Sequence, residues 1–521
     1  MHNSSSSVNK LLRISVLFFQ VVSVLLAAGL TTQDASAQTD EIIWASPINL
    51  SNSPEATSTD PIVVADPAGI VHLFWAEKMG TAPGNSTDTL IYAQWDGKNW
   101  SKPVDIFFSP YSDGNPIVNF PHAVMDERGT IHLIWLSEPN APSYSLNYSS
   151  VPSNQADRVS SWKPRIELAD DLTGTIYAID IAYSPPQTLH VIYARGAPGD
   201  AQDKERSVTY IQSTDGGETW SEPMDIHIIY DLERGASNTR LLVEPPNRVY
   251  ASWTEWDATG NGQAIFFTRS FDGGSSWDSP IKLTERIDDE YERDWNSLVL
   301  LGENKLMAMW EGGYRAYRYA MYSEDGGETW SYAVDTFPWL IGENGFAEFA
   351  RDSSDILHLF ICQRIREGEF EREDAGGLYH SVWEGGQRWR DPVLSGGVNP
   401  MVNPKVAIYG GNRVMVTWYS SAYLEIMVMS GEIGNTPPIA PVAWPTSSLD
   451  VKPTDAPVSL PVDTNQEIQP EQTPTFSASN DPSSTTDQFN SRNLIIIGVF
   501  SPFLVTAIFI VFNKRRSRLH H

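Results

Sequence analysis

The stretch Ser213-Thr-Asp-Gly-Gly-Glu-Thr-Trp220 recurs as Ser270-Phe-Asp-Gly-Gly-Ser-Ser-Trp277 and as Ser323-Glu-Asp-Gly-Gly-Glu-Thr-Trp330. The two glycines permit the positive φ of a tight hairpin turn, and the Asp carboxylate can accept backbone N–H groups across it. Shorter versions of the pattern end at Trp100, Trp162 and Trp389, and most are followed by a proline and a short alternating strand. The tryptophans recur roughly every 57 residues, so the chain is built from internal repeats.

A second pattern gives the same repeat independently. Seven apolar strands, each preceded by a turn, occur at 71–75, 131–135, 189–193, 249–253, 306–310, 357–361 and 414–418. Units of this length with four strands each are typical of propeller blades. The last unit lacks its outer strand, and the fragment Trp44–Leu50 has no preceding half. We therefore expect an all-β, seven-bladed β-propeller over 38–435, closed by the N-terminal strand, with six blades as the alternative.

The two ends of the chain have targeting features. Residues 1–37 combine Lys10 and Arg13, an apolar run and small residues for cleavage, which indicates a signal peptide. Residues 493–513 are apolar and long enough for a transmembrane helix, and a basic tail follows at 514–521. The Pro/Ser/Thr-rich residues 436–492 predict a disordered stalk. We expect a single-pass protein of the cell membrane, with the N-terminal domain extracellular and the C-terminus cytoplasmic.

Composition excludes several classes of function. The formal charge of −29 argues against nucleic acid as a partner. The single cysteine, Cys362, excludes a disulfide framework and is expected in the core. Four histidines recur at one position of equivalent strands, so a packing role is favoured over a metal site. Each Asp-Gly-Gly turn offers only one carboxylate, and we expect no metal and no cofactor. The histidines are His72, His132, His190 and His358.

The three full turns resemble Asp boxes, the BNR repeats of the sialidase superfamily. The resemblance covers the propeller and implies a glycan-binding fold that can carry glycosidase activity. Sialidases hold the substrate carboxylate with three arginines and use a Tyr nucleophile paired with a Glu, together with an Asp acid/base catalyst. The family's first arginine lies in a Phe-Arg-Ile-Pro motif that this sequence lacks, and residues 41–70 contain no arginine. The chain is therefore identified as a divergent member.

Charged residues gather where loops are expected to meet at one mouth of the central channel. Loops leaving the second strands and entering the first strands belong to the same face, where propeller sites usually form. We expect Glu255, Glu311 and Tyr314 to act on the glycosidic bond. The expected substrate-binding residues are Arg195, Arg234, Arg293, Asp294 and Arg364.

Three functions are compatible with these features. The first is a membrane-anchored, sialidase-like protein that engages extracellular glycans or glycoproteins and hydrolyses terminal sugars. The second is a non-catalytic glycan- or protein-binding adhesion propeller displayed on a stalk, which the missing Phe-Arg-Ile-Pro motif favours over a true sialidase. The third is a structural envelope protein.

Overall fold

The computed structural model divides the chain into two compact units, Met1–Ser447 and Ser448–His521. The described residues all belong to the first unit: 41–79, 88–108, 117–140, 143–173, 178–196, 206–285, 293–313, 316–342, 345–365, 377–396 and 401–442. The predicted signal peptide, nearly all of the predicted stalk, the predicted transmembrane helix and the tail lie outside them. No helix within the described ranges is long and apolar enough to cross a membrane.

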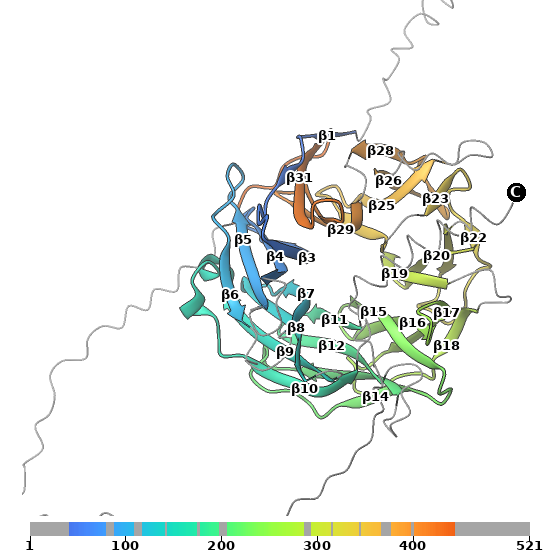
Figure 1. The fold of residues 1–521 in the computed structure, drawn as a ribbon. Coiled ribbons are helices and arrows are strands. Elements are labelled where there is room, and N and C mark those ends of the chain that lie inside the picture. The colour runs from blue at the N-terminus through green and yellow to red at the C-terminus, as the bar shows by residue number, and fades with distance from the viewer. Residues whose placement is uncertain are drawn as a thin grey trace, which may run out of the picture. The chain divides into compact units, whose positions relative to one another are not determined.

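The strands form seven antiparallel sheets arranged as the blades of a ring (Figure 1). Blade 1 contains β3 (Ala56–Ala65), β4 (Val71–Met79), β5 (Asp88–Trp95) and β6 (Val104–Phe108). Blade 2 contains β7 (Ile117–Met125), β8 (Thr130–Asn140), β9 (Ser143–Pro152) and β10 (Ile166–Thr173). Blade 3 contains β11 (Ile179–Ser184), β12 (Thr188–Arg195), β13 (Arg206–Ser213) and β14 (Met224–Ile229). Two short 3₁₀ turns, η1 (Ser153–Gln155) and η2 (Val159–Ser161), lie between β9 and β10.

The remaining blades continue around the ring. Blade 4 contains β15 (Arg234–Glu244), β16 (Arg248–Asp257), β17 (Gly262–Ser270) and β18 (Ile281–Glu285). Blade 5 contains β19 (Arg293–Gly302), β20 (Lys305–Gly312), β21 (Tyr317–Ser323) and β22 (Val334–Asp335). Blade 6 has an interrupted inner strand and contains β23 (Leu340–Gly342), β24 (Glu348–Arg351), β25 (Leu357–Ile365), β26 (Gly377–Gly385), β27 (Arg388–Trp389) and β28 (Val393–Gly396). Blade 7 contains β29 (Met401–Tyr409), β30 (Arg413–Ser420), β31 (Glu425–Ile433), β1 (Ile42–Trp44) and β2 (Ile48–Asn49).

The N-terminal strand completes the last blade, as predicted. In β1, Ile42 lies opposite Ile433 and Trp44 lies opposite Gly431 of β31. In β2, Ile48 lies opposite Val428 of the same strand. This pairing removes the open edge that β31 would otherwise present. The prediction of seven blades is confirmed.

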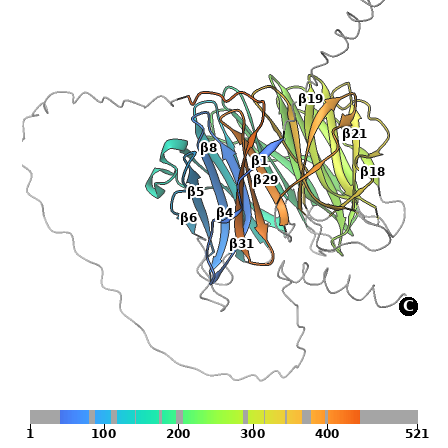
Figure 2. The ribbon, with the colours of Figure 1, turned by 90° about the horizontal axis from the view of Figure 1, so that it is seen from above.

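The core of the propeller lies between the blades. Figure 2 shows the strands running between the two faces of the ring. Seven hydrophobic clusters occur in the described part of the chain, and each takes residues from two neighbouring blades. Because the second strand of each blade is covered on both sides, five of them carry a tryptophan that is almost completely buried. These are Trp75, Trp135, Trp253, Trp310 and Trp418.

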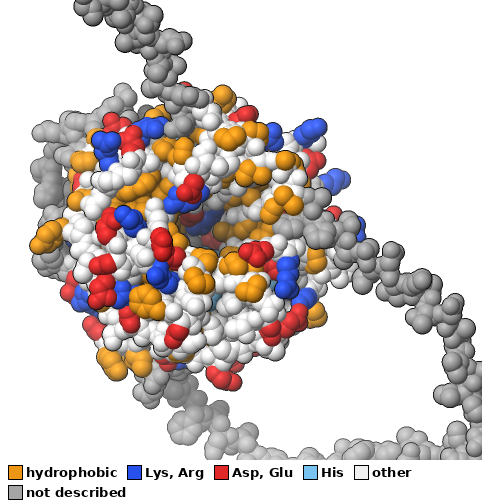
Figure 3. All heavy atoms as spheres, turned by 180° about the vertical axis from the view of Figure 1, so that it is seen from behind, with side chains coloured by type: hydrophobic (Ala, Val, Ile, Leu, Met, Phe, Trp, Pro, Cys, Tyr) orange, Lys and Arg blue, Asp and Glu red, His pale blue; other side chains and the backbone are white. Residues whose placement is uncertain are grey.

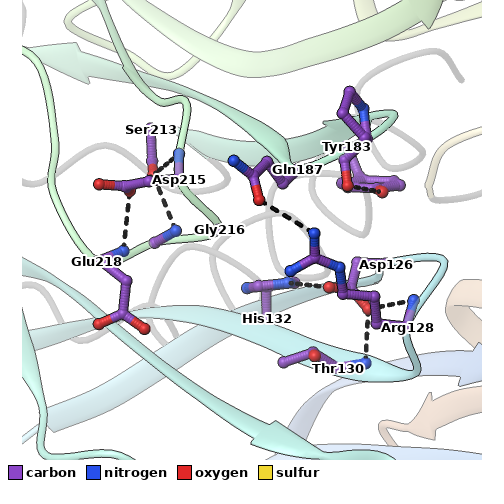
Figure 4. Close-up of polar contacts among 12 residues, drawn as sticks. Asp126, Arg128, Thr130, His132, Tyr183, Gln187, Ser213, Asp215, Gly216 and Glu218 are labelled. Carbon is purple, nitrogen blue, oxygen red and sulfur yellow. Dashed lines mark hydrogen bonds and ion pairs between the residues drawn. The ribbon is translucent and has the colours of Figure 1, made fainter.

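The repeated Asp-Gly-Gly turns join neighbouring blades. In the turn at 213–220, Asp215 accepts the backbone N–H of Glu218 at 3.1 Å and the hydroxyl of Ser213 at 2.8 Å (Figure 4). Ser213 Oγ also accepts the backbone N–H of Gly217 at 2.8 Å. The φ of Gly217 is +88°, and a Cβ there would lie 1.9 Å from the hydroxyl of Tyr148 in the preceding blade. The second glycine is therefore required by its close approach to the neighbouring blade as well as by its φ.

The histidines and the cysteine are buried packing residues. His72, His132 and His190 hydrogen-bond through Nδ1 to tyrosine hydroxyls of the third strand of their own blade, at 2.7, 2.8 and 2.5 Å. His358 instead contacts His380 at 2.8 Å. Cys362 is 1% exposed. The packing roles expected for these residues are confirmed.

The chain after β31 crosses the face that carries the turns between first and second strands. Thr436 Oγ1 donates to Asp352 of blade 6 at 2.6 Å, Ile439 N donates to Gly410 O of blade 7 at 2.8 Å, and Val442 N donates to Pro67 O of blade 1 at 2.9 Å. Residues 436–442, which lie within the predicted stalk, therefore pack on the propeller.

Two glycines of one turn provide a test of this account. Gly274 has φ of +91°, and a Cβ there would lie 2.0 Å from the hydroxyl of Tyr210, whereas Gly273 has φ of +72° and open space around it. Gly273→Ala should cost about 1 kcal/mol of unfolding free energy, from the backbone alone. Gly274→Ala should cost about 2–3 kcal/mol more, because Tyr210 must move. Chemical denaturation measures both, and equal losses would contradict the interblade contact.

Candidate functional site

The inner strands share a backbone irregularity that directs side chains into the channel. In five blades the first strand slips its register against the second, and the first residue of the slip has a φ of about +50°. Bulges of this kind occur next to active sites, and bulky residues in this φ range are unusual. The residues with positive φ are Asp60, Phe120, Asn238, Trp295 and Asn403.

Residues in or next to four of these bulges line a hollow at the centre of the ring. Its lining comes from blades 1, 2, 4, 6 and 7 and combines carboxyl, imidazole, guanidinium, amide and ammonium groups with an aromatic ring. Figure 3 shows the molecule hollowed at its centre, with Lys or Arg side chains inside the hollow. The lining residues are Asp60, Pro61, Phe120, Pro121, His122, Arg240, Phe346, Asn403 and Lys405.

Two cationic side chains share one aromatic ring in this hollow. The guanidinium carbon of Arg240 lies 3.4 Å from the centre of the Phe346 ring, and Lys405 Nζ lies 4.8 Å from it. Trp295 meets the same ring edge-on, with the ring centres 5.0 Å apart. Phe346 is 1% exposed. The ring therefore holds two positive charges from opposite parts of the propeller close together.

Carboxylates partly balance these cations. Lys405 Nζ contacts Glu348 at 2.6 Å, and burial lowers the pKa of Lys405 although Glu348 opposes the shift. His122 Nδ1 lies 3.0 Å from Asp180, and burial lowers the pKa of His122. Burial raises the pKa of Asp180, but the hydrogen bond and charge of His122 and the charge of Arg240 outweigh it, so the pKa of Asp180 is lowered. The pairs His122–Asp180 and Lys405–Glu348 therefore each join one residue of the hollow's lining to a carboxylate of a neighbouring blade.

Asp60 differs from the other acids of the hollow. Burial raises its pKa to about 6, against hydrogen bonds from Thr59 and the Phe120 backbone and the charge of Lys405. Burial, followed by the charge of Asp60, also raises the pKa of Tyr419, on β30, to about 12. An acid that titrates near pH 6 in a hollow is a candidate proton donor, and Tyr419 stays neutral beside it.

The sequence-predicted residues of blade 4 form an ion-pair network. Glu255 Oε1 lies 3.1 Å from His227 Nε2, and its Oε2 lies 3.4 Å from Arg234 Nη1. Arg234 also contacts Asp231 at 3.5 Å and Glu285 at 3.6 Å. The structure thus brings Glu255 and Arg234 together, and neither is among the residues that line the central hollow.

The other predicted site residues whose side chains are described each form hydrogen bonds or ion pairs with residues of their own or a neighbouring blade. Arg195 Nη2 contacts both carboxylate oxygens of Asp225, at 3.3 and 3.2 Å. Glu311 pairs with Arg318 at 2.8 Å. Asp294 is 8% exposed and accepts hydrogen bonds from Asn238 and, at 3.0 Å, from Trp256 Nε1. Arg293 Nε donates to Thr284 at 3.3 Å.

Two predicted residues cannot be placed. Tyr314 lies outside the described residues, and the side chain of Arg364 is not described. Among the described side chains, no group of three or more His, Cys, Asp or Glu is arranged to hold a metal ion.

Sequence reasoning missed the residues of the central hollow, although a signal for them exists. Pro61, Pro121 and Pro404 lie at equivalent positions in inner strands. Because proline within a sheet is confined to edges, first positions and bulges, three such prolines indicate bulges there. Phe346 carries no such signal.

Comparisons with known proteins give similarities of fold. No protein-family model matches the sequence, and no curated protein matches it. Solved structures that resemble it include a protein of unknown function from Dyadobacter fermentans, at 15% identity, TM-score 0.44, covering 75% of this chain and 99% of that one. An ulvan lyase is 12% identical with a TM-score of 0.46, and the match covers 74% of this chain and 93% of the lyase. A Hadza microbial sialidase is 13% identical with a TM-score of 0.42, and the match covers 76% of this chain and 97% of the sialidase. None of these similarities assigns a role to a residue of this chain.

The raised pKa of Asp60 predicts how stability depends on pH. Its pKa is about 6 when folded and 3.8 ordinarily, so its favourable contribution is complete below pH 3.8 and is lost as pH rises through 6. Relative to the wild type, Asp60→Asn should therefore gain stability between pH 4 and pH 7, by up to about 3 kcal/mol. Asparagine also tolerates the positive φ at this position. Denaturation at a series of pH values measures the difference.

Asp215 supplies the opposite control. The hydroxyl and backbone N–H of Thr219 lower its pKa to about 2, so its contribution is present above pH 3.8 and is lost as pH falls through 2. Asp215→Asn should be less stable than the wild type at neutral pH, with a difference that shrinks in acid. A difference for Asp60→Asn that does not change with pH would contradict the assignment.

Proposed function

We propose that the protein is a glycan-acting propeller whose central hollow binds an acidic sugar. The observation that carries this proposal is the placement of Arg240, Lys405 and Asp60 in one hollow together with the Phe346 ring. Guanidinium and ammonium groups bind carboxylates or sulfates, and a pocket with a few convergent polar groups is the usual form of a ligand site.

The chemistry of the hollow supports hydrolysis of a glycosidic bond. With a pKa of about 6, Asp60 is protonated in a large fraction of molecules at mildly acidic pH. It can then donate a proton to the leaving oxygen of a sugar held by Arg240 and Lys405. Water then attacks the anomeric carbon as its bond to the leaving oxygen breaks, and the proton that this water releases restores the protonated Asp60. Tyr419, whose pKa the charge of Asp60 raises, is the candidate hydrogen-bond partner of the reacting groups. Activity should fall as pH rises through about 6.

The resemblance of the Asp-Gly-Gly turns to those of sialidases supports this class of substrate. The sequence-predicted residues Glu255, Glu311, Tyr314, Arg195, Arg234, Arg293, Asp294 and Arg364 stay candidates for contacts with the rest of the glycan. The predicted signal peptide and transmembrane helix support display on the outer surface of the cell membrane, which is part of the proposal.

A non-catalytic binding propeller is the second candidate. The carboxylates of Glu255 and Glu311 favour it, because both are buried and held in ion pairs. Glu255 contacts His227 and Arg234, and Glu311 contacts Arg318. Carboxylates held in ion pairs serve recognition and rigidity more readily than proton transfer.

Variants of the hollow distinguish these functions. Arg240→Met and Lys405→Met should each weaken binding of acidic oligosaccharides on a glycan array about tenfold or more, since each removes a charge-assisted contact. Lys163→Met is the control, because Lys163 pairs with Glu218 at an exposed outer position. Unchanged binding in both hollow variants would exclude this site.

Asp60→Asn separates binding from hydrolysis. It should abolish turnover of fluorogenic sialosides or uronides at pH 5 while leaving affinity within a few-fold of the wild type. Binding by the wild type without turnover at any pH between 4 and 8 would instead establish the second candidate function.

A further inference from the structure

The interface between blades 5 and 6 contains a buried ion pair beside the central hollow. Arg318 on β21 and Glu311 on β20 lie directly opposite each other, and their side chains meet at 2.8 Å. The Arg318 side chain is 0% exposed and that of Glu311 is 8% exposed. Both face blade 6, because they lie on the same face of their strands as Met307, Met309, Ala320 and Tyr322, which pack against Leu359 and Ile361.

Arg318 reaches across the interface to the chain segment that enters the hollow. Its Nη2 donates to the backbone oxygen of Gly345 at 2.7 Å. Gly345 lies in the interruption of the inner strand of blade 6, immediately before Phe346. Two residues along, Ala347 N donates to Ser297 Oγ of blade 5 at 3.0 Å. The segment Gly345–Ala347 is thus held to blade 5 by one hydrogen bond on each side of Phe346.

The same segment has little freedom on its other side. Gly345 has φ of +119°, and a Cβ there would lie 2.8 Å from Cα of Asn403, a lining residue of the hollow. A displacement of Gly345 therefore moves either Asn403 or Phe346. Since Arg240 and Lys405 both lie against the Phe346 ring, a displacement of Phe346 changes the surroundings of both cations.

The ion pair is poorly explained by stability alone. Among the residues that the structure describes, none accepts a hydrogen bond from the buried Nε or Nη1 of Arg318. A buried charged pair with unsatisfied donors is often no more stable than apolar residues of similar size, whereas it can fix one arrangement among several. A role in geometry accounts for a guanidinium at this position.

We propose that Arg318, held by Glu311, is a positioning residue that fixes Gly345 and Phe346 and thereby sets the distance between Arg240 and Lys405. This inference rests on the proposed function for its effect on glycan binding. Its structural part, the control of the segment 345–347 by Arg318, stands independently. In this proposal Glu311 acts by holding Arg318 in place through their ion pair.

The test uses the double variant Arg318→Met with Glu311→Gln, which leaves no unpaired buried charge. Hydrogen exchange of the peptide that contains residues 345–347 should become at least tenfold faster. The thermal midpoint should stay within a few degrees of the wild type or rise, and affinity for acidic oligosaccharides should fall about tenfold. Arg318→Lys, which keeps a donor, should restore part of the protection.

Arg269→Met is the matched control. Arg269 also crosses a blade interface, donates to a glycine oxygen, that of Gly326 at 3.0 Å, and pairs with Asp278 and Glu328, but it lies at a repeated turn away from the hollow. It should lower the thermal midpoint without changing exchange at 345–347 or glycan affinity.

The outcomes are separable. Unchanged exchange at 345–347 in the double variant overturns the positioning role. Faster exchange there with no glycan binding even by the wild type supports the positioning role and removes the proposed function. If Glu311→Gln alone stops turnover but leaves exchange and affinity unchanged, Glu311 acts on the substrate directly and its assigned role is wrong.

Discussion

Closure of the ring depends on hydrogen bonding between the first and the last strands of the domain. The β1 and β2 segments add to β31, so blade 7 is built from both ends of the propeller. Each hydrophobic cluster takes residues from two blades, including the clusters on both sides of blade 7. If blade 7 opened, both of those clusters would lose packing. The geometry of the central hollow depends on the same closure, because Lys405 and Asn403 belong to blade 7.

Bulges in the inner strands convert this closed ring into a candidate site. A regular inner strand would alternate its side chains between the two neighbouring blades. The register slips interrupt that alternation, and Asp60, His122, Arg240 and Lys405 line the hollow beside or within them. Blade 3, whose inner strand is regular, contributes Asp180 as a partner of His122. Blade 6 contributes Phe346 through an interruption. Asp60, Phe120 and Asn403 have positive φ and line the hollow, so part of the cost of this backbone conformation falls where a ligand is expected.

The sequence repeat predicts most of the fold, but it predicts few of the residues of the candidate site. The Trp44 fragment could be assigned to blade 7, because a missing strand at one end matched a surplus strand at the other. The histidines could be recognised as packing residues, because they recur at one strand position in four separate blades. The repeat places Glu255 and Glu311 after the expected second strands, but it does not give their partners, because His227, Arg234 and Arg318 lie on other strands. The hollow depends on departures from the repeat, and only the prolines of three bulges mark these departures in the sequence.

The segment from Thr436 to Val442 has a mechanical consequence. It is bonded in turn to Asp352, Gly410 and Pro67, which belong to three consecutive blades spanning the seam of the ring. A force transmitted through the chain beyond Val442 would first load the hydrogen bond to blade 1, then the one to blade 7, and finally the one to blade 6. Tension would thus be borne by hydrogen bonds to three blades before it reached β31, the strand whose pairing with β1 closes the ring.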